Sequence, residues 1–309
     1  MGKKSYTGFM LNCFKKSKKL TIVVLGWIDM LSSARLFAKY ESVLVFHEIS
    51  DTPCKLSVNY GTSTSTTLMN KLLNEYENGT WMSTLKLKFT FDDGFLVPFD
   101  ILSRIEDLNI PTTFFVNALT IDTGLDYQIV KKGWSPKERN TFKLSKNEAR
   151  ILLTSLKSKY KESDLIYLQG GRQNWSAVKD LYRRGFTIGD HFLIHLDMQE
   201  CSGEVIETYL EESAALFLKN NIVVEEFALP YGGGRKKQVW EILSFGFNRV
   251  YGGSAWNVIR SQSGCIPRVQ ISEGYNNPLM LRGELLLNRL TQSIISLLRD
   301  KQSEYSARK

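Results

Sequence analysis

The sequence predicts an α/β fold built from repeated strand–helix units. Strand-like and helix-like segments alternate along most of its 309 residues, an order typical of parallel sheets covered by helices. Hydrophobic residues make up 43% of the chain and aromatic residues 12%, which suits a sizeable core and a chain long enough for one large α/β barrel or two modest domains. The sequence shows no internal repeat and no low-complexity linker, so we expect one main domain.

The elements of the first half are marked by short apolar runs. Residues 42–46 predict a strand that ends at His47. Residues 67–78 predict a helix that carries Leu68, Leu72, Leu73 and Tyr76 on one side and stops at Gly79. The next strand is expected at residues 85–91, where apolar and basic residues alternate, and it ends at two adjacent aspartates. A helix at 98–108 and a strand at 112–116 follow.

A long insertion is expected near residues 118–165. It begins as a polar loop rich in Lys and Arg, after which Ser145 and Glu148 form a capping box that predicts a helix. This insertion could cover a site, select an acceptor or simply decorate the surface. Residues 166–168, which two glycines follow, predict another short strand.

The second half continues the alternation. Residues 230–234 read Pro-Tyr-Gly-Gly-Gly, a turn whose backbone can approach a ligand closely because glycine has no Cβ. The predicted helices are residues 175–184, 204–218, 239–245 and 281–298, and the predicted strands are residues 186–188, 222–229 and 248–251. A basic tail at residues 299–309 follows the last helix.

The candidate site combines the aspartate pair Asp92–Asp93 with the only three histidines, His47, His191 and His195. The last two are four residues apart, a spacing that would place both imidazoles on one side of a helical turn. Two carboxylates at a strand end can divide the work, one binding a metal and one handling protons. Each part alone has an ordinary structural explanation, but together they favour an Asp-plus-two-His metal site that activates water.

Several motifs resemble those of the NodB-type polysaccharide deacetylases, carbohydrate esterases that remove acetyl groups from amino sugars. Thr-Phe-Asp-Asp-Gly at residues 90–94 is similar to the family's first motif, His-x-x-x-His at 191–195 to its second and Phe-Ala-Leu-Pro-Tyr-Gly at 227–232 to its third. Residues 110–116 match the strand after the first motif. The resemblance spans about residues 41–270 and implies a distorted (β/α) barrel with the metal at the carboxyl ends of the strands.

The resemblance also implies roles for the site residues. Asp93, His191 and His195 would hold a divalent metal, Asp92 would be the general base and the backbone N–H of Tyr231 would stabilise an oxyanion. Zinc best fits two imidazoles and a carboxylate, although cobalt, nickel or iron would fit the same ligands.

Two departures from the common family pattern need an explanation. Ala228 stands where many members have the arginine that tethers the catalytic aspartate, and no histidine follows His195. The chain resembles instead a branch with a histidine on the first strand and Pro-Arg near the end of the domain. By that resemblance His47 is the candidate general acid and Arg268 the candidate tether; a histidine of the core and an ordinary surface arginine are the alternatives.

We therefore expect a metal-dependent hydrolase that removes N-acetyl groups from an amino sugar in a surface polysaccharide, an oligosaccharide or its lipid-linked precursor. One alternative is a sugar O-deacetylase or N-deformylase on the same fold. Another is a non-catalytic saccharide-binding or scaffold protein on a degenerate deacetylase fold.

Charge and the chain ends suggest a second kind of partner. The net charge of +8 suits an anionic partner, and because no nucleic-acid motif accompanies it we expect a membrane surface or an anionic glycan carrier, with a merely basic, soluble surface as the alternative. Six lysines precede nine uncharged residues at 20–28, a stretch too short to span a membrane. It could be an amphipathic helix on an anionic membrane face or a weak signal peptide, which Asp29 disfavours.

These observations predict the layout and the location of the protein. We expect a basic segment at residues 1–40, a deacetylase-like domain at 41–275 and a C-terminal helix and tail at 276–309. The protein is expected to be cytoplasmic or peripheral at the inner membrane, with export as the alternative. Four scattered cysteines indicate neither a thiolate zinc site nor a disulfide framework.

Overall fold

Seven parallel strands form the centre of the fold, in the order β6-β5-β4-β3-β2-β1-β7. The computed structural model describes residues 18–32, 37–124, 158, 161–261, 263–272 and 278–306. The strands are β1 (Ser42–Phe46), β2 (Leu87–Phe91), β3 (Thr112–Val116), β4 (Thr187–Asp190), β5 (Glu226–Ala228), β6 (Arg249–Tyr251) and β7 (Val269–Gln270). The sheet is curled into a half-barrel, so the predicted distorted (β/α) barrel is confirmed.

The two edges of the curled sheet approach each other through one short segment. Ile266 forms an isolated parallel bridge with Tyr251 at the end of β6. Three residues later, Val269 in β7 pairs with Leu44 in β1. Residues 266–270 therefore bridge β6 and β1, and Arg268 lies in this segment, with its side chain buried.

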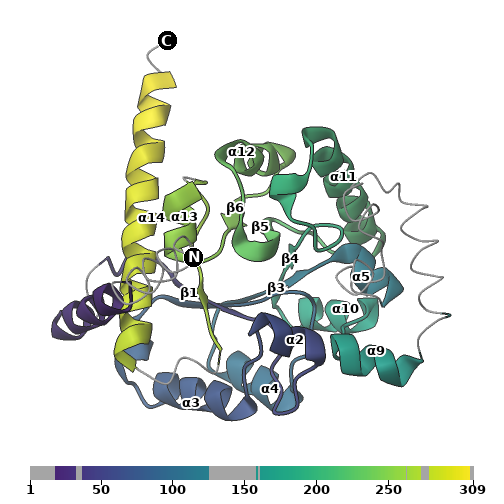
Figure 1. Cartoon of the computed structure of the whole chain (residues 1–309), viewed down its shortest axis with the longest axis horizontal. Coiled ribbons are helices and arrows are strands. Elements are labelled where there is room, and N and C mark those ends of the chain that lie inside the picture. The colour runs from purple at the N-terminus through teal and green to yellow at the C-terminus, as the bar shows by residue number, and fades with distance from the viewer. Residues whose placement is uncertain are drawn as a thin grey trace, which may run out of the picture.

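Helices cover the outside of the sheet (Figure 1). A helix over residues 18–31 comes before the first strand. The others are α2 (Lys55–Tyr60), α3 (Thr66–Glu77), α4 (Phe99–Asp107), α5 (Ala118–Thr123), α9 (Glu162–Gln169), α10 (Trp175–Arg183), α11 (Gly203–Lys219), α12 (Lys236–Phe245), α13 (Ala255–Ser261) and α14 (Pro278–Ser306). Three 3₁₀ turns accompany them: η1 (Trp81–Thr84), η2 (Met198–Glu200) and η3 (Pro230–Gly232).

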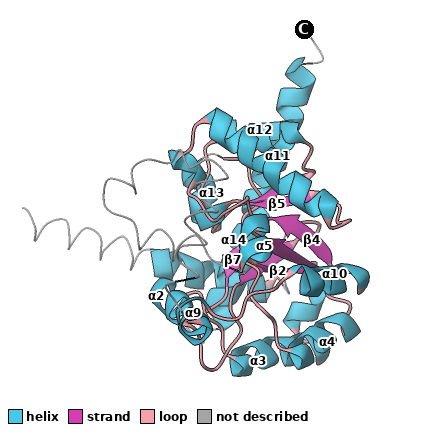
Figure 2. Cartoon of the chain, turned by 90° about the vertical axis from the view of Figure 1, so that its right-hand side faces the viewer, coloured by secondary structure: helices cyan, strands magenta, loops and turns pink. Residues whose placement is uncertain are grey.

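The three central strands lie entirely within the core. All residues of β1, β2 and β3 are buried, because parallel strands are covered on both faces. The rings of Phe46, Phe91 and Phe114 stack across these three strands, with centroid separations of 5.3 and 4.9 Å. The pairing of Phe46 with Phe91 brings the ends of β1 and β2 level. Figure 2 shows the sheet in the interior between helices.

Lys88 of β2 is buried, and a carboxylate accounts for it. Its Nζ lies 2.7 and 2.8 Å from the two carboxylate oxygens of Glu226. Thr113 and Tyr251 also donate hydrogen bonds to Glu226. Burial of a charge requires such pairing, so the basic residue in the alternating run belongs to the interior.

Most predicted elements appear with ends shifted by one to three residues, but several predictions were wrong. Residues 118–123, expected to begin a polar loop, form the largely buried helix α5. The last helix, expected to end at 298 before a basic tail, extends as α14 to Ser306. Residues 166–168 belong to α9 and not to a strand, and Ile166 and Tyr167 are exposed on that helix. A short apolar run does not distinguish strand from helix. The strand expected at 222–229 is limited to β5. The predicted helix that begins near Ser145 lies outside the described residues. Among the residues described, no helix has the length and hydropathy needed to cross a membrane.

Candidate active site

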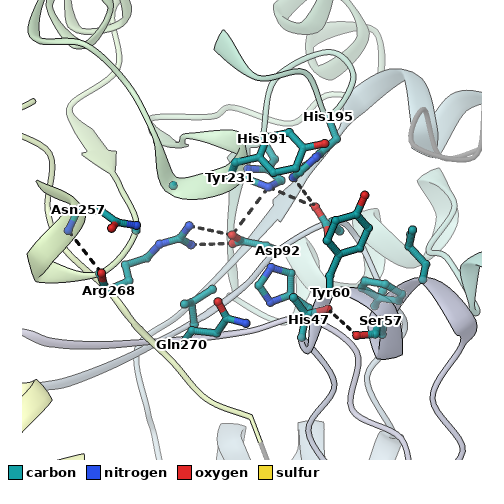
Figure 3. A pocket seen from close by; sticks show the side chains of 18 residues that line it. His47, Ser57, Tyr60, Asp92, His191, His195, Tyr231, Asn257, Arg268 and Gln270 are labelled. Carbon is teal, nitrogen blue, oxygen red and sulfur yellow. Dashed lines mark hydrogen bonds and ion pairs between the residues drawn. The ribbon is translucent and has the colours of Figure 1, made fainter. Parts of the chain in front are cut away.

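The site residues converge because parallel strands end at the same edge of the sheet. His47 follows β1, Asp92 and Asp93 follow β2, and His191 follows β4. Together with His195 they line one pocket, whose volume is about 340 Å³. Figure 3 shows Asp92 between the guanidinium of Arg268 and the imidazole of His191, with the ring of His47 beside it.

Asp93, His191 and His195 form a compact group that could hold a metal. Their ligand atoms all lie within 4.8 Å of one another, and all three residues are buried. The Oδ1 atom of Asp93 is 3.2 Å from Nε2 of His191 and 3.3 Å from Nε2 of His195. One carboxylate oxygen and two imidazole nitrogens therefore face one small volume, an arrangement that suits a divalent ion such as zinc.

The two histidines reach this position through an irregular segment, so the expected helical turn is wrong. Phe192 adopts a left-handed backbone conformation, with φ of 72°, and its buried ring packs against Tyr209 and Phe227. Asn117, at the end of β3, donates from its amide to the carbonyls of His191 and Phe192 at 2.5 and 3.2 Å. The side chain of Asn117 and the buried ring of Phe192 thus replace helical hydrogen bonds in orienting the imidazoles.

The tautomer of His191 is determined by its backbone partner. Its Nδ1 lies 2.8 Å from the carbonyl oxygen of Ala228, which can only accept, so Nδ1 donates. The Nε2 atom therefore faces Asp93. Burial opposes charge on these groups, but the nearby Asp92 and Asp93 raise the pKa of His191, and the imidazoles of His195 and His191 hold the pKa of Asp93 well below its usual range.

Arg268 contacts Asp92 through two parallel hydrogen bonds. Its Nη1 and Nη2 atoms donate to the two carboxylate oxygens at 2.7 and 2.8 Å, and both side chains are almost fully buried. Its Nε donates to the carbonyl of Gly252. Although burial acts to raise it, the guanidinium holds the pKa of Asp92 below its usual value. Position 228, where many family members have an arginine, is alanine here, and Arg268, 40 residues further along the chain, contacts Asp92 instead.

His47 lies on the strand next to Asp92 and faces the same pocket. The backbone N–H of Asp92 donates to the carbonyl of Phe46, the residue before His47. The Nδ1 atom of His47 is buried and has no hydrogen-bond partner among the described residues. Burial lowers the pKa of His47 and outweighs the opposite effect of Asp93 and Asp92. The imidazole is therefore poised toward its neutral form when no metal is bound.

Tyr231 lies on the other side of His195. It belongs to η3 and has a left-handed backbone, with φ of 57°. Its ring meets the His195 ring edge to face at a centroid distance of 4.5 Å. The next residue must be glycine, because a Cβ at Gly232 would lie 2.4 Å from Cα of Gly253. This close contact brings the Pro-Tyr-Gly turn against the rim of the pocket.

Several residues of the site escaped the sequence analysis. Ser57 and Tyr60 of α2, Asn257 of α13 and Gln270 of β7 add polar groups to the pocket wall. They lie on three separate segments, α2, α13 and β7, so no single local pattern could reveal them. Asn117 could have been noticed, because it directly follows a predicted strand as Asp92 does.

Two further polar residues, Arg172 and Asp190, lie next to the metal-ligating group. Arg172 donates to the backbone carbonyl of Asp93 at 2.9 Å, and its guanidinium stacks over Phe95 at 3.5 Å from the ring centroid. Asp190, which precedes His191, is completely buried, and burial raises its pKa to about 7. Neither residue belongs to a recognisable spacing in the sequence.

Comparisons with known proteins agree with this geometry. The fold resembles three solved structures: the Streptococcus pyogenes deacetylase PplD in complex with acetate (12% identity, 79% of this chain and 96% of that chain, TM-score 0.50), IcaB from Ammonifex degensii (15%, 79% and 97%, 0.50) and BC0361, a polysaccharide deacetylase from Bacillus cereus (14%, 79% and 68%, 0.51). At these identities the likeness shows the fold alone. A comparison with curated proteins gave no match.

A family model carries the assignment. The model described as polysaccharide deacetylase matches residues 84–250, more than half of the chain. The matched region includes the aspartate pair, both histidines of the metal-ligating group and the Pro-Tyr-Gly turn. The chain therefore belongs to the polysaccharide deacetylase family.

Proposed function

We propose that this protein is a metal-dependent hydrolase that removes N-acetyl groups from an amino sugar in a surface polysaccharide, an oligosaccharide or its lipid-linked precursor. The observation that carries the proposal is the convergence of Asp93, His191 and His195 beside an aspartate held by Arg268. The first three supply metal ligands, and the fourth, Asp92, supplies a base in the same pocket.

The donor set fits a divalent cation. With Nδ1 of His191 donating to a carbonyl, Nε2 of that ring faces Oδ1 of Asp93 at 3.2 Å, and neither atom has a hydrogen-bond partner within the part of the chain that the structure describes. Two buried acceptors at this distance repel unless a proton or a metal ion lies between them. A cation held by Asp93, His191 and His195 would lower the pKa of a water ligand and polarise a carbonyl.

The remaining residues have separate tasks in the proposed reaction. Asp92, kept ionised by Arg268, accepts the proton of the attacking water. In this proposal the backbone N–H of Tyr231 would stabilise the oxyanion that forms on the acetyl carbonyl. His47 in its protonated form would deliver a proton to the departing amine, since it is the one remaining imidazole of the chain. Because burial lowers its pKa, this acid would lose its proton at a lower pH than an exposed histidine.

The pocket wall suits a carbohydrate. Hydroxyl and amide groups from Ser57, Thr62, Asn257 and Gln270 surround the reacting groups, and such groups can hydrogen-bond to sugar hydroxyls. The half-exposed ring of Tyr60 offers a face for a sugar ring. Hydrolysis of a sugar O-acetyl or N-formyl group uses the same machinery, and a non-catalytic saccharide-binding role uses the same wall, so both remain competing proposals.

The test combines metal analysis with product analysis. Purified protein should carry about one divalent ion per chain, as for a three-ligand site, and should release acetate from an N-acetylglucosamine oligomer. His191→Ala is the control, because it should lose both properties. Acetate release only from O-acetylated sugar, or formate release from an N-formyl sugar, would favour the first alternative. Oligomer binding without any release would favour the scaffold.

A further inference from the structure

The helix over residues 18–31 is held against α14 by backbone contact. A Cβ at Gly26 would lie 2.0 Å from the carbonyl oxygen of Leu279, and one at Gly283 would lie 1.9 Å from the carbonyl oxygen of Ile22. Only glycine permits two helices to come this close. The helix projects at the side of the molecule, purple in Figure 1.

The face that packs on α14 is small and polar. Asp29 is completely buried and pairs with Arg289 at 2.5 Å, while Arg282 lies 3.8 Å away. Ile22 is the buried apolar residue on this face, packed with Ala255 and Leu287. The inner face therefore combines glycine and an ion pair with Ile22 and the partly buried Leu25, and it leaves most of the other large apolar side chains of the helix outside.

The opposite face carries the large apolar side chains. Residues spaced at helical intervals along it are 42–79% exposed: Leu20, Val24, Trp27, Ile28 and Leu31. We call these five the outer apolar face. A contiguous apolar stripe on the outside of a firmly packed helix marks a contact surface, because a helix with only a structural role would bury it.

Charge indicates what covers this face. Within residues 18–32 the only carboxylate is Asp29, which is buried in the ion pair, whereas Lys19 is exposed. Lys15 and Lys16 precede the helix in the sequence. An exposed surface that is apolar along the helix and basic at its start, with no exposed acid, is complementary to anionic lipid headgroups over acyl chains. Trp27 is the residue type favoured at that boundary.

We propose that the outer apolar face docks on the surface of an anionic phospholipid membrane, with the helix lying in the plane of the interface. The sequence left a membrane helix and a signal peptide open. The backbone contact with α14 and the buried pair of Asp29 favour the first, because they hold the helix as part of the folded domain.

The docking helix packs on α13, which also contributes a residue to the pocket. Ile22 packs on Ala255 of α13, and Nζ of Lys18 lies 5.8 Å from the centroid of the Trp256 ring. The following residue, Asn257, lines the pocket. A docked protein would therefore act on glycans near the membrane; this consequence rests on the proposed function, whereas the docking itself does not.

Co-sedimentation with vesicles tests the docking without any activity measurement. The full-length protein should bind vesicles of phosphatidylcholine with about 30% phosphatidylglycerol roughly tenfold more tightly than phosphatidylcholine vesicles, and about 0.5 M salt should weaken this binding. The variant Val24→Gln/Trp27→Gln/Leu31→Gln should lose binding by more than roughly tenfold, because three apolar groups no longer enter the interface.

A matched variant controls for a general loss of exposed apolar surface. Val223→Gln/Trp240→Gln/Leu218→Gln removes the same three residue types, also half-exposed or more, from the region of α11 and α12. It should bind vesicles like the wild type. Circular dichroism should show both triple variants folded, since the altered side chains are outside the core.

Other results would overturn the proposal. Equal binding of the two triple variants, or no preference of the wild type for anionic vesicles, would do so. So would a dimer in analytical ultracentrifugation that Val24→Gln/Trp27→Gln/Leu31→Gln dissociates, because the face would then bind a second copy. As a measurement that needs no triple variant, brominated lipids should quench the fluorescence of wild type more than that of Trp27→Phe; equal quenching would also contradict docking.

Discussion

Replacement of Arg268 by methionine tests the most specific contact of the site. The substitution keeps an unbranched side chain of similar length and removes the charge and both hydrogen bonds to Asp92. The guanidinium and the carboxylate are only 3% and 4% exposed. Removal of one partner from a buried ion pair typically costs about 3–5 kcal/mol, so we expect a loss of unfolding free energy of that order at neutral pH.

The loss should depend on pH. In the wild type, Arg268 holds the pKa of folded Asp92 below its unfolded value, so this carboxylate stabilises the fold above the unfolded pKa, and the contribution disappears as the pH falls through the folded pKa. Without the guanidinium, burial should raise the pKa of folded Asp92. The difference in unfolding free energy between the two proteins should therefore grow as the pH rises between the two folded-state pKa values.

Two assays check this reasoning. Urea unfolding near pH 4.5 and near pH 7.5 should give a smaller difference between wild type and Arg268→Met at the acidic pH, where protonation of Asp92 relieves the unpaired charge. The acidic limb of the profile of kcat/KM against pH should move to higher pH, because the base must be ionised. Arg268→Lys is the matched control, because it keeps the charge but not the bidentate geometry. Its unfolding free energy and the position of its acidic limb should lie between those of wild type and Arg268→Met. A loss that is independent of pH, with an unmoved acidic limb, would refute the tether.

Four further predictions concern the site. Asp92→Asn should retain metal and fold but lose activity by roughly 10²–10⁴, and a rate near wild type would show that another group is the base. His191→Ala and His195→Ala together should abolish metal retention during dialysis against a chelator, as measured by mass spectrometry; full retention would contradict the site. His47→Ala should keep the metal, lower turnover and remove the alkaline limb of the pH–rate profile, with a smaller effect on an activated aryl acetate that needs no leaving-group proton. In metal-free protein, Asp190→Asn should stabilise the fold above pH 7 and not near pH 4, because the raised pKa of Asp190, about 7, makes its ionisation oppose folding as the pH rises from its unfolded pKa; a pH-independent difference in urea unfolding would contradict this.

The sequence alone was informative wherever chemistry follows directly on a buried strand. His47 comes after a continuous apolar run and Asp92 after a strand that alternates apolar and basic residues, and parallel strands bring such ends to one edge whatever the loops between them do. Most helices and strands were placed within two or three residues, but the last helix, expected at 281–298, extends to Ser306. The strand predicted at 166–168 was wrong, because the residues around this short apolar run show no clear helical periodicity that would have indicated α9.

Side chains that depend on distant partners could not be deduced in this way. Lys88 looked like one member of an alternating run, but Glu226, from β5, makes it an interior residue. The expected helical turn between His191 and His195 is instead an irregular segment held by Asn117. In both cases the deciding hydrogen bond joins residues that are far apart in the chain, and local propensity contains no information about it.

The contact of Arg268 with Asp92 and the outer apolar face illustrate this division most clearly. Motif resemblance proposed the first pair, but only the curl of the sheet, which returns residues 266–270 from β6 to β1, carries the guanidinium to the carboxylate. The sequence likewise marked residues 20–28 as apolar without indicating which side is buried. Gly26 and Gly283 decide that, because the missing Cβ atoms let two backbones touch and direct the large side chains outward. Sequence determines which chemical groups are present and which strands carry them, whereas the long-range packing of the chain determines which of those groups meet.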